Sequence, residues 1–368
     1  MCRRIDIENF ICYNNLITIT FGKDAPMRSY MSFLYGNRAA KEQLGHAAEK
    51  DALSHALIIE GPQGSGKKTF ARQIIASALC EERHKEGVPL PCGCCRACRL
   101  VLEGKAADVR WISRADKATL SVDTVRAEKN DMYLAPNEFE HKFYVFEDAH
   151  TMTLQAQNAL LIALEEPPRN VHILLLCESA DALLTTVRSR ARLVKMQKFT
   201  KEEVGAWLEE NSPLSVQAFA NTPEKLDALL TEADGCIGRA LLLTDVQNAE
   251  EVFKERELTE LTLSSLSSHS FTKLSSAFSI YPTKRDELIL ALNSLLRALR
   301  DLVLLKRDAN APLTYFSDAQ LIPQAFLSLK MTTLLRSMEG VEQAMRKLER
   351  NANSATVLNV LKYTLRKG

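Results

Sequence analysis

The 368-residue sequence lacks the features that mark several specialised classes of protein. It contains no apolar run of the roughly 18 residues that a membrane-spanning helix needs, and its start shows no signal-peptide pattern. It also lacks an excess of either charge, because 47 basic and 46 acidic side chains leave a formal net charge of +1. We therefore expect a cytoplasmic protein with no membrane partner, in which any contact with nucleic acid depends on a local patch of charge.

The nine cysteines are too unevenly placed for a disulfide framework, since five of them lie within residues 80–98. Four have the spacing of metal ligands: Cys80, Cys92, Cys95 and Cys98. The last three are separated by two residues each, which lets a tight turn direct their sulfurs at one ion, and the first can supply a fourth thiolate. The pattern predicts a closed, structural Zn²⁺ site, in which Cys94 is an alternative to a neighbouring ligand.

A glycine-rich turn at residues 61–69 follows the apolar run 56–59 and precedes a helical pattern. A strand, such a turn and a helix in this order form a phosphate cradle, because glycines let backbone N–H groups converge on an anion. The predicted nucleotide-binding residues here are Gly61, Gly64, Gly66, Lys67, Lys68 and Thr69. One position departs from the P-loop pattern, because Lys68 stands where a Ser or Thr would ligand Mg²⁺, and Thr69 comes one place late.

A second apolar run, residues 142–146, ends in Glu147 and Asp148. In P-loop ATPases the strand beside the cradle ends in acids that hold hydrated Mg²⁺ and polarise the attacking water, usually as Asp then Glu. Here the order is reversed, and the shorter Asp at the second position is expected to fall short of the water. Solvated acids that merely cap a strand end are the alternative interpretation.

Alternation of apolar runs with helical patterns predicts a doubly wound α/β domain, in which residues 171–177 form a buried parallel strand. A capping box at residues 200–203 then opens a small helical module that ends near Arg239. Amphipathic patterns predict further helices at residues 287–306, 331–350 and 357–365. The Ser-rich segment 263–276 is expected to be a loop or a weakly specified helix between modules.

Residues 1–32 fit poorly with the pattern that follows them. Residues 10–21 are a mixed apolar and polar run without an obvious partner strand. One interpretation is an extra strand at the edge of the sheet. The other is that the native protein starts at Met27 or Met31.

Four features occur together: the P-loop, the cysteine cluster just after its helix, the string at residues 158–168, and Ser189-Arg190 after the next apolar run. In combination they resemble the bacterial DNA polymerase III clamp-loader subunits, which are AAA+ proteins, from about residue 33 to the C-terminus. The resemblance implies an α/β AAA+ P-loop domain at residues 33–199 with a zinc knuckle at 80–98. A small helical lid domain at 200–245 and an all-α collar domain at 246–368 would follow, after an N-terminal extension at 1–32.

The resemblance allows two roles within that family. The gamma/tau subunits are ATPase motors, whereas delta prime subunits typically do not hydrolyse ATP and act as a stator that offers a Ser-Arg finger to a neighbouring ATP site. Lys68, the inverted acids and Cys177 in place of a Thr-rich sensor favour delta prime. Arg190 is retained, although Ala191 replaces the cysteine usual in the family, so the resemblance implies an arginine finger acting in trans.

The implied partners are the gamma/tau and delta subunits, the sliding clamp, and primed DNA through the assembled complex. In the alternative, the chain is a gamma/tau-like ATPase with ATP and Mg²⁺ as cofactors. Lys67 would then bind the β/γ-phosphates, and Thr69 or a water would take the magnesium role. Glu147 and Asp148 would serve the metal and the water, and Arg239 would sense nucleotide from the lid.

Overall fold

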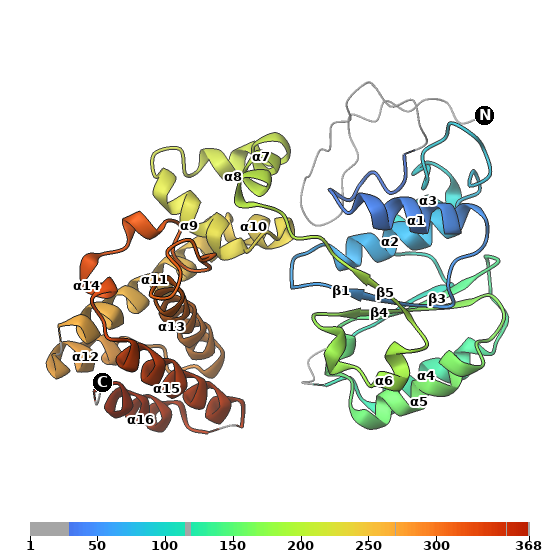
Figure 1. The fold of residues 1–368 in the computed structure, drawn as a ribbon. Helices are drawn as coiled ribbons and strands as arrows, with labels where there is room; N and C mark the ends of the chain where they lie inside the picture. The colour runs from blue at the N-terminus through green and yellow to red at the C-terminus, as the bar shows by residue number, and fades with distance from the viewer. Residues whose placement is uncertain (1–28, 115–118, 269, 351, 367–368) are drawn as a thin grey trace. The chain divides into compact units, whose positions relative to one another are not determined.

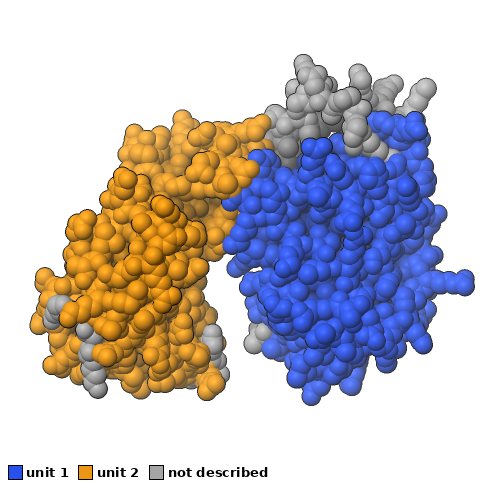
Figure 2. Space-filling view, in the orientation of Figure 1, with its two compact units in different colours: residues 1–199, 236–238 blue, residues 200–235, 239–368 orange. Residues whose placement is uncertain are grey.

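The computed structural model describes residues 29–114, 119–268, 270–350 and 352–366. The chain divides into two compact units: residues 1–199 with 236–238, and residues 200–235 with 239–368 (Figure 2). The predicted N-terminal extension lies outside the described residues except for residues 29–32. There Tyr30 forms a β-bridge with Leu90, and Met31 is fully buried in the core of the first unit.

Unit 1 is organised around a parallel sheet of five strands in the order β2-β3-β4-β1-β5. The strands are β1 (Ala56–Glu60), β2 (Val109–Ile112), β3 (Lys142–Phe146), β4 (Val171–Cys177) and β5 (Arg192–Lys195). Every residue of the central strand β4 is buried, as expected for a continuous apolar strand that is covered on both faces. The doubly wound α/β fold with a parallel sheet that the sequence predicts is confirmed.

Helices cover both faces of this sheet (Figure 1). One face carries α1 (Arg38–Glu49), α2 (Lys67–Ala78) and α3 (Arg96–Leu102), and the other carries α4 (Val122–Met132), α5 (Leu154–Glu165) and α6 (Thr185–Arg188). Successive residues of β1 alternate between the two cores, with Leu57 and Ile59 in the first and Ile58 in the second. Two short 3₁₀ helices, η1 (Ala149–Thr151) and η2 (Ala180–Ala182), follow β3 and β4.

The strand register brings the predicted site residues to one edge of the sheet. Glu60, the last residue of β1, pairs with Cys177 of β4 and with Lys195 of β5. Phe146, the last residue of β3, pairs with Leu175 two residues before the end of β4. The segments that follow β1, β3 and β4 therefore all emerge at the carboxyl edge, where open α/β sheets bind their ligands.

Unit 2 is helical. Its elements are α7 (Lys201–Asn211), α8 (Pro213–Gln217), α9 (Pro223–Ala233), most of α10 (Ile237–Leu243), α11 (Val246–Ser267), α12 (Phe271–Ser279), α13 (Arg285–Leu305), η3 (Ala319–Leu321), α14 (Gln324–Leu327), α15 (Met331–Glu349) and α16 (Ser354–Arg366). The predicted capping box is present, because the side chains of Thr200 and Glu203 each accept from the other's backbone N–H. None of the described helices is long and apolar enough to cross a membrane.

For the Ser-rich segment 263–276 the sequence allowed a loop or a weakly specified helix, and the structure shows that most of it is helical. Helix α11 runs through to Ser267, and α12 begins at Phe271. Leu263, Leu266 and Leu274 are buried in the large core of unit 2, so burial at helical spacing outweighs the low helix propensity of serine. Hydroxyl groups on this segment also bond back to their own helix, as Ser265 Oγ does to Leu261 O at 2.7 Å.

Asp301 on α13 is a fully buried carboxylate that holds the segment 314–316. It accepts hydrogen bonds from the backbone N–H groups of Thr314 (2.9 Å), Tyr315 (2.7 Å) and Phe316 (3.2 Å). Removal of this acceptor would leave buried donors without a partner, and each such donor is costly.

We predict that Asp301→Ala lowers the free energy of unfolding of unit 2 by about 3 kcal/mol in a chemical denaturation experiment. Asp308→Ala is the matched control, because Asp308 is exposed and its side chain accepts from Asn310 N–H at 2.9 Å. That variant should change stability by no more than about 0.5 kcal/mol. Equal losses in the two variants would contradict the assigned role of Asp301.

Candidate functional site

The predicted phosphate cradle, residues 61–69, lies between β1 and α2. Gly64 and Gly66 have φ of 79° and 88°, in the left-handed region that glycine adopts without strain. Gly61 also requires glycine, because an added Cβ would lie 2.7 Å from Ser65 Oγ and 2.8 Å from Met196 Cβ. The backbone therefore forms a tight turn at the N-terminus of a 12-residue helix, as a phosphate cradle needs.

Two further contacts hold this turn. Lys67 Nζ donates to the carbonyl oxygens of Gly61 (2.6 Å) and Pro62 (2.9 Å), and burial lowers the pKa of its ammonium. The N–H of Gly238, at the start of α10, donates to Gly64 O at 3.0 Å. An added Cβ at position 238 would lie 2.8 Å from that oxygen, so only glycine allows this close approach.

Each of the two acids that follow β3 is paired with a cation of the same chain. Lys68 Nζ lies 2.8 Å from Glu147 Oε2, and the Glu147 side chain is only 16% exposed. Arg114 Nε lies 3.8 Å from Asp148 Oδ2. Thr69, the alternative oxygen ligand, is exposed on α2. The structure thus brings Lys68 and Glu147 together and leaves Thr69 on the outside of the helix.

Cys177 occupies the end of β4, beside the cradle. Its carbonyl oxygen accepts from Gly61 N–H at 3.1 Å. Burial raises the pKa of its thiol to about 12, so the side chain stays protonated and chemically inert at neutral pH. A buried, protonated thiol is a weak hydrogen-bond donor and does not ligand a metal ion. Cys177 therefore contributes little to the binding of a phosphate in the cradle.

Arg190 follows α6 and is half-buried. Its Nη2 lies 2.9 Å from Glu165 Oε1 on α5, and its Nη1 donates to Thr186 O at 3.0 Å. These contacts lie on α5 and α6 and not on residues 61–69, so the described residues do not bring Arg190 to the cradle of its own chain. Glu165 is about half exposed (48%), which leaves the ion pair open to solvent.

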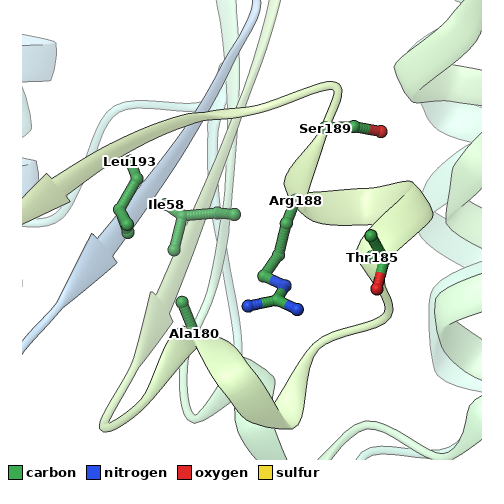
Figure 3. A pocket seen from close by; sticks show the side chains of 6 residues that line it. All are labelled: Ile58, Ala180, Thr185, Arg188, Ser189 and Leu193. Carbon is green, nitrogen blue, oxygen red and sulfur yellow. The ribbon is translucent and has the colours of Figure 1, made fainter.

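A cavity of about 330 Å³ lies beside α6 (Figure 3). Its lining consists of Ile58, Ala180, Thr185, Arg188, Ser189 and Leu193. Arg188 donates from Nη1 to Asp181 Oδ1 at 2.6 Å, while its buried Nε has no hydrogen-bond partner within the described residues. The sequence indicated a role for Arg190 but did not predict this cavity, whose walls come from β1, η2, α6 and β5.

Arg239, the predicted lid residue, belongs to unit 2. It donates to Glu232 Oε1 at 2.6 Å, and the same carboxylate pairs with Arg297 of α13. Glu232 is buried between these two guanidinium groups. Arg239 is therefore part of an ion-pair cluster inside unit 2.

The four predicted metal ligands come together, since the sulfurs of Cys80, Cys92, Cys95 and Cys98 all lie within 4.8 Å of one another. The Sγ atoms of Cys92 and Cys98 are 3.9 Å apart. A tetrahedral zinc site with Zn–S bonds of about 2.3 Å has sulfurs about 3.8 Å apart, which this separation matches. Cys94 Sγ lies 3.7 Å from Cys92 Sγ but falls outside the cluster of four.

The electrostatics of the cluster also fit a metal ion. Hydrogen bonds from Cys80, Cys95 and Cys98 hold the pKa of Cys92 far below its ordinary value, while the same crowding raises the pKa of Cys98. Four crowded thiols cannot all ionise without a cation between them. Backbone N–H groups of Cys95 and Cys98 point at the sulfurs of Cys92 and Cys95 at 3.4 Å, an arrangement that stabilises thiolates.

Sequence reasoning missed two residues that shape the cradle. Gly238 lies in a helical segment where an isolated glycine can mark a close backbone approach, and this signal was available. No sequence pattern indicated a role for Arg114, because its pairing with Asp148 arises only when β2 and β3 lie side by side.

Comparison with known proteins shows that residues 36–200 match a family model described as "DNA polymerase III, delta subunit". The chain is 31% identical to DNA polymerase III subunit tau of Salmonella typhimurium over 194 residues, which cover 52% of this chain and 29% of that protein. It is 25% identical to subunit delta' of Bacillus subtilis over 327 residues, which cover 88% of this chain and 94% of that protein. The predicted resemblance to the DNA polymerase III clamp-loader subunits is confirmed.

The tau proteins that match are much longer than this chain, which covers 29% of the Salmonella typhimurium protein and 36% of the tau protein of Bacillus subtilis. Among solved structures, a gamma subunit-related protein from Thermotoga maritima matches 88% of this chain and 97% of its own chain, with 22% identity and a TM-score of 0.44.

We predict that natively purified protein contains about one zinc ion per chain by elemental analysis. Cys92→Ser should lose the metal and lower the free energy of unfolding of unit 1 by more than about 3 kcal/mol, because a structural metal adds its binding energy to folding. Cys94→Ser should keep the metal and lose no more than about 1 kcal/mol. A metal-free native protein, or equal losses from both substitutions, would contradict the ligand assignment.

Proposed function

From this resemblance, we propose that the chain acts as the delta prime subunit of a bacterial DNA polymerase III clamp loader. In that role it is a stator in the pentameric ring that opens the sliding clamp and places it on primed DNA. Its partners would be the gamma/tau and delta subunits and the clamp, with DNA bound through the assembled complex. The extent of the matches supports delta prime, because the delta' alignment covers 88% of this chain and the tau alignment covers 52%.

One observation carries the stator role: the acids after β3 are neutralised by the chain's own cations. Turnover needs Mg²⁺ between such acids and the phosphates. Lys68 is already 2.8 Å from Glu147. A divalent ion at this carboxylate would have to displace the ammonium or lie beside it, which repulsion between like charges opposes, so hydrolysis in this chain's own cradle is not supported.

Arg190 would supply the chemistry of this subunit by acting in trans. An arginine finger stabilises charge on the transferring phosphate and contributes about 10³ to 10⁵ in rate. Its present partner, Glu165, is about half exposed, and exposed ion pairs contribute only about 0 to 1 kcal/mol. Arg190 can therefore exchange Glu165 for the phosphate of a neighbouring subunit at little cost.

The domain roles extend the same proposal. Residues 33–199 would be the AAA+ domain, 200–245 the lid and 246–368 the collar that joins the subunits of the ring. Separate cores support this division: Phe219 and Leu229 form a small cluster with the first two turns of α11, while the rest of α11 enters the large core with α12 to α16. Helix α11 would thus connect the lid to the collar.

The alternative is a gamma/tau-like ATPase, and the intact glycine turn favours it. Gly64 and Gly66 keep the left-handed conformation of a phosphate-binding turn, and Lys67 lies at the start of α2, where the P-loop pattern places its lysine. Turnover of ATP by the isolated protein, abolished by Lys67→Ala, would establish this alternative and refute a stator without its own activity.

We predict that Arg190→Ala folds and assembles with its partner subunits but lowers the clamp-loading ATPase of the reconstituted complex by about tenfold or more. The expected loss follows from removal of the guanidinium that faces the neighbour's ATP. Arg192→Ala is the matched control, since Arg192 is an exposed arginine two residues away on β5. Undiminished activity of the complex with Arg190→Ala would refute the finger.

A further inference from the structure

The residues around the cradle do not fit the Mg²⁺ ion that P-loop sites usually hold. Mg²⁺ requires oxygen ligands in a near-octahedral arrangement. At the hydroxyl position this chain has Lys68, whose ammonium carries three donors and no lone pair. Its contact with Glu147 at 2.8 Å, and that of Arg114 with Asp148 at 3.8 Å, engage both carboxylates that would otherwise face the ion.

The part of the site that would hold phosphate does fit. Gly64 and Gly66 adopt the left-handed turn, and the first N–H groups of α2 have no acceptor within their own helix. Lys67 and Lys68 place two ammonium groups at this same helix end, where a negative charge is also favoured by the helix dipole. The site thus combines strong anion recognition with a cation already in place.

A contact independent of any metal stabilises this geometry. Gly238 N–H donates to Gly64 O at 3.0 Å, and the approach is so close that an added Cβ would lie 2.8 Å from the oxygen. Gly61 N–H is likewise bonded to Cys177 O at 3.1 Å. The turn is therefore held by backbone hydrogen bonds on both sides, and it does not need a metal-bound phosphate to order it.

We propose that Lys68 is a built-in cation that replaces Mg²⁺, so that the cradle binds a nucleoside diphosphate or triphosphate as the metal-free anion. The Lys68 side chain is 60% exposed, and the lysine stem has several rotatable bonds, so its ammonium can contact Glu147 and a phosphate oxygen in turn, or both together. Mg²⁺ in solution competes for the same phosphate oxygens. Nucleotide binding is therefore insensitive to Mg²⁺ or weakened by it, the reverse of an ordinary P-loop site.

This inference concerns the cradle of this chain and does not depend on the role of Arg190 in trans. If the protein is a stator whose cradle binds no nucleotide, the proposed function is correct and this inference is wrong. A metal-free nucleotide site would satisfy the inference even if Arg190→Ala left the reconstituted complex fully active.

The test is a fluorescence titration of the full-length protein with N-methylanthraniloyl-ADP, in excess EDTA and in excess Mg²⁺. For the unaltered protein the dissociation constant in EDTA should equal the value in Mg²⁺ within about threefold, or be lower. Lys68→Thr restores the hydroxyl and frees Glu147, so Mg²⁺ should now tighten binding by about tenfold or more. Lys67→Ala should abolish binding in both conditions.

Lys195→Met is the matched control. Lys195 also pairs with an acid at the end of a strand, Glu60 at 3.3 Å, and is 71% exposed. Its replacement should leave both dissociation constants unchanged, and circular dichroism should show all variants folded.

Three results would overturn the proposal. The first is tightening of binding by Mg²⁺ in the unaltered protein, which would show that a metal is used. The second is nucleotide binding by the Lys68→Thr variant but not by the unaltered protein, which would show that Lys68 blocks the cradle and does not replace the metal ion. The third is absence of binding in every variant and condition.

Discussion

The in-register ending of parallel strands at one edge of the sheet is the constraint on which the site depends. Glu60 of β1 lies opposite Cys177 of β4, and β3 ends close by, so three segments distant in sequence share one edge. The cradle after β1 and the acids after β3 can interact only because of this register. Side-chain packing on both faces holds the register, since a shift by one residue would exchange the apolar side chains of β4 between two differently packed cores.

At that edge the chain replaces a metal-centred arrangement with ion pairs between its own side chains. Lys68 contacts Glu147, Arg114 contacts Asp148, and Lys67 is bonded to carbonyl oxygens of the loop. The two ion pairs need not be strong to disfavour a divalent ion, because each puts positive charge beside a carboxylate that such an ion would use. In the role proposed above, such a subunit would keep the shape of a nucleotide site while its influence on ATP would pass through a residue elsewhere, Arg190.

Local patterns predicted most of the fold and much of the site. The glycine turn, the cysteine spacing and the apolar strands each follow from interactions within a few residues, and the structure forms all three. The sequence left the Ser-rich segment open between a loop and a weakly specified helix, and the burial of Leu263, Leu266 and Leu274 decides for the helix over the weak preference of serine against it. The partner of Asp148 and the cavity beside Arg188 could not be predicted, because their residues meet only across strands and helices.

The sequence by itself determined that a P-loop is present, that Lys68 breaks its metal position, and that four cysteines have ligand spacing. It determined these because backbone freedom at glycine and the reach of neighbouring side chains are local properties. Only the tertiary structure decided what the altered residues contact: Lys68 with Glu147, Gly238 with Gly64, and Arg190 with Glu165. Ion pairs and close backbone approaches between distant segments depend on strand register and helix packing, which no local pattern specifies.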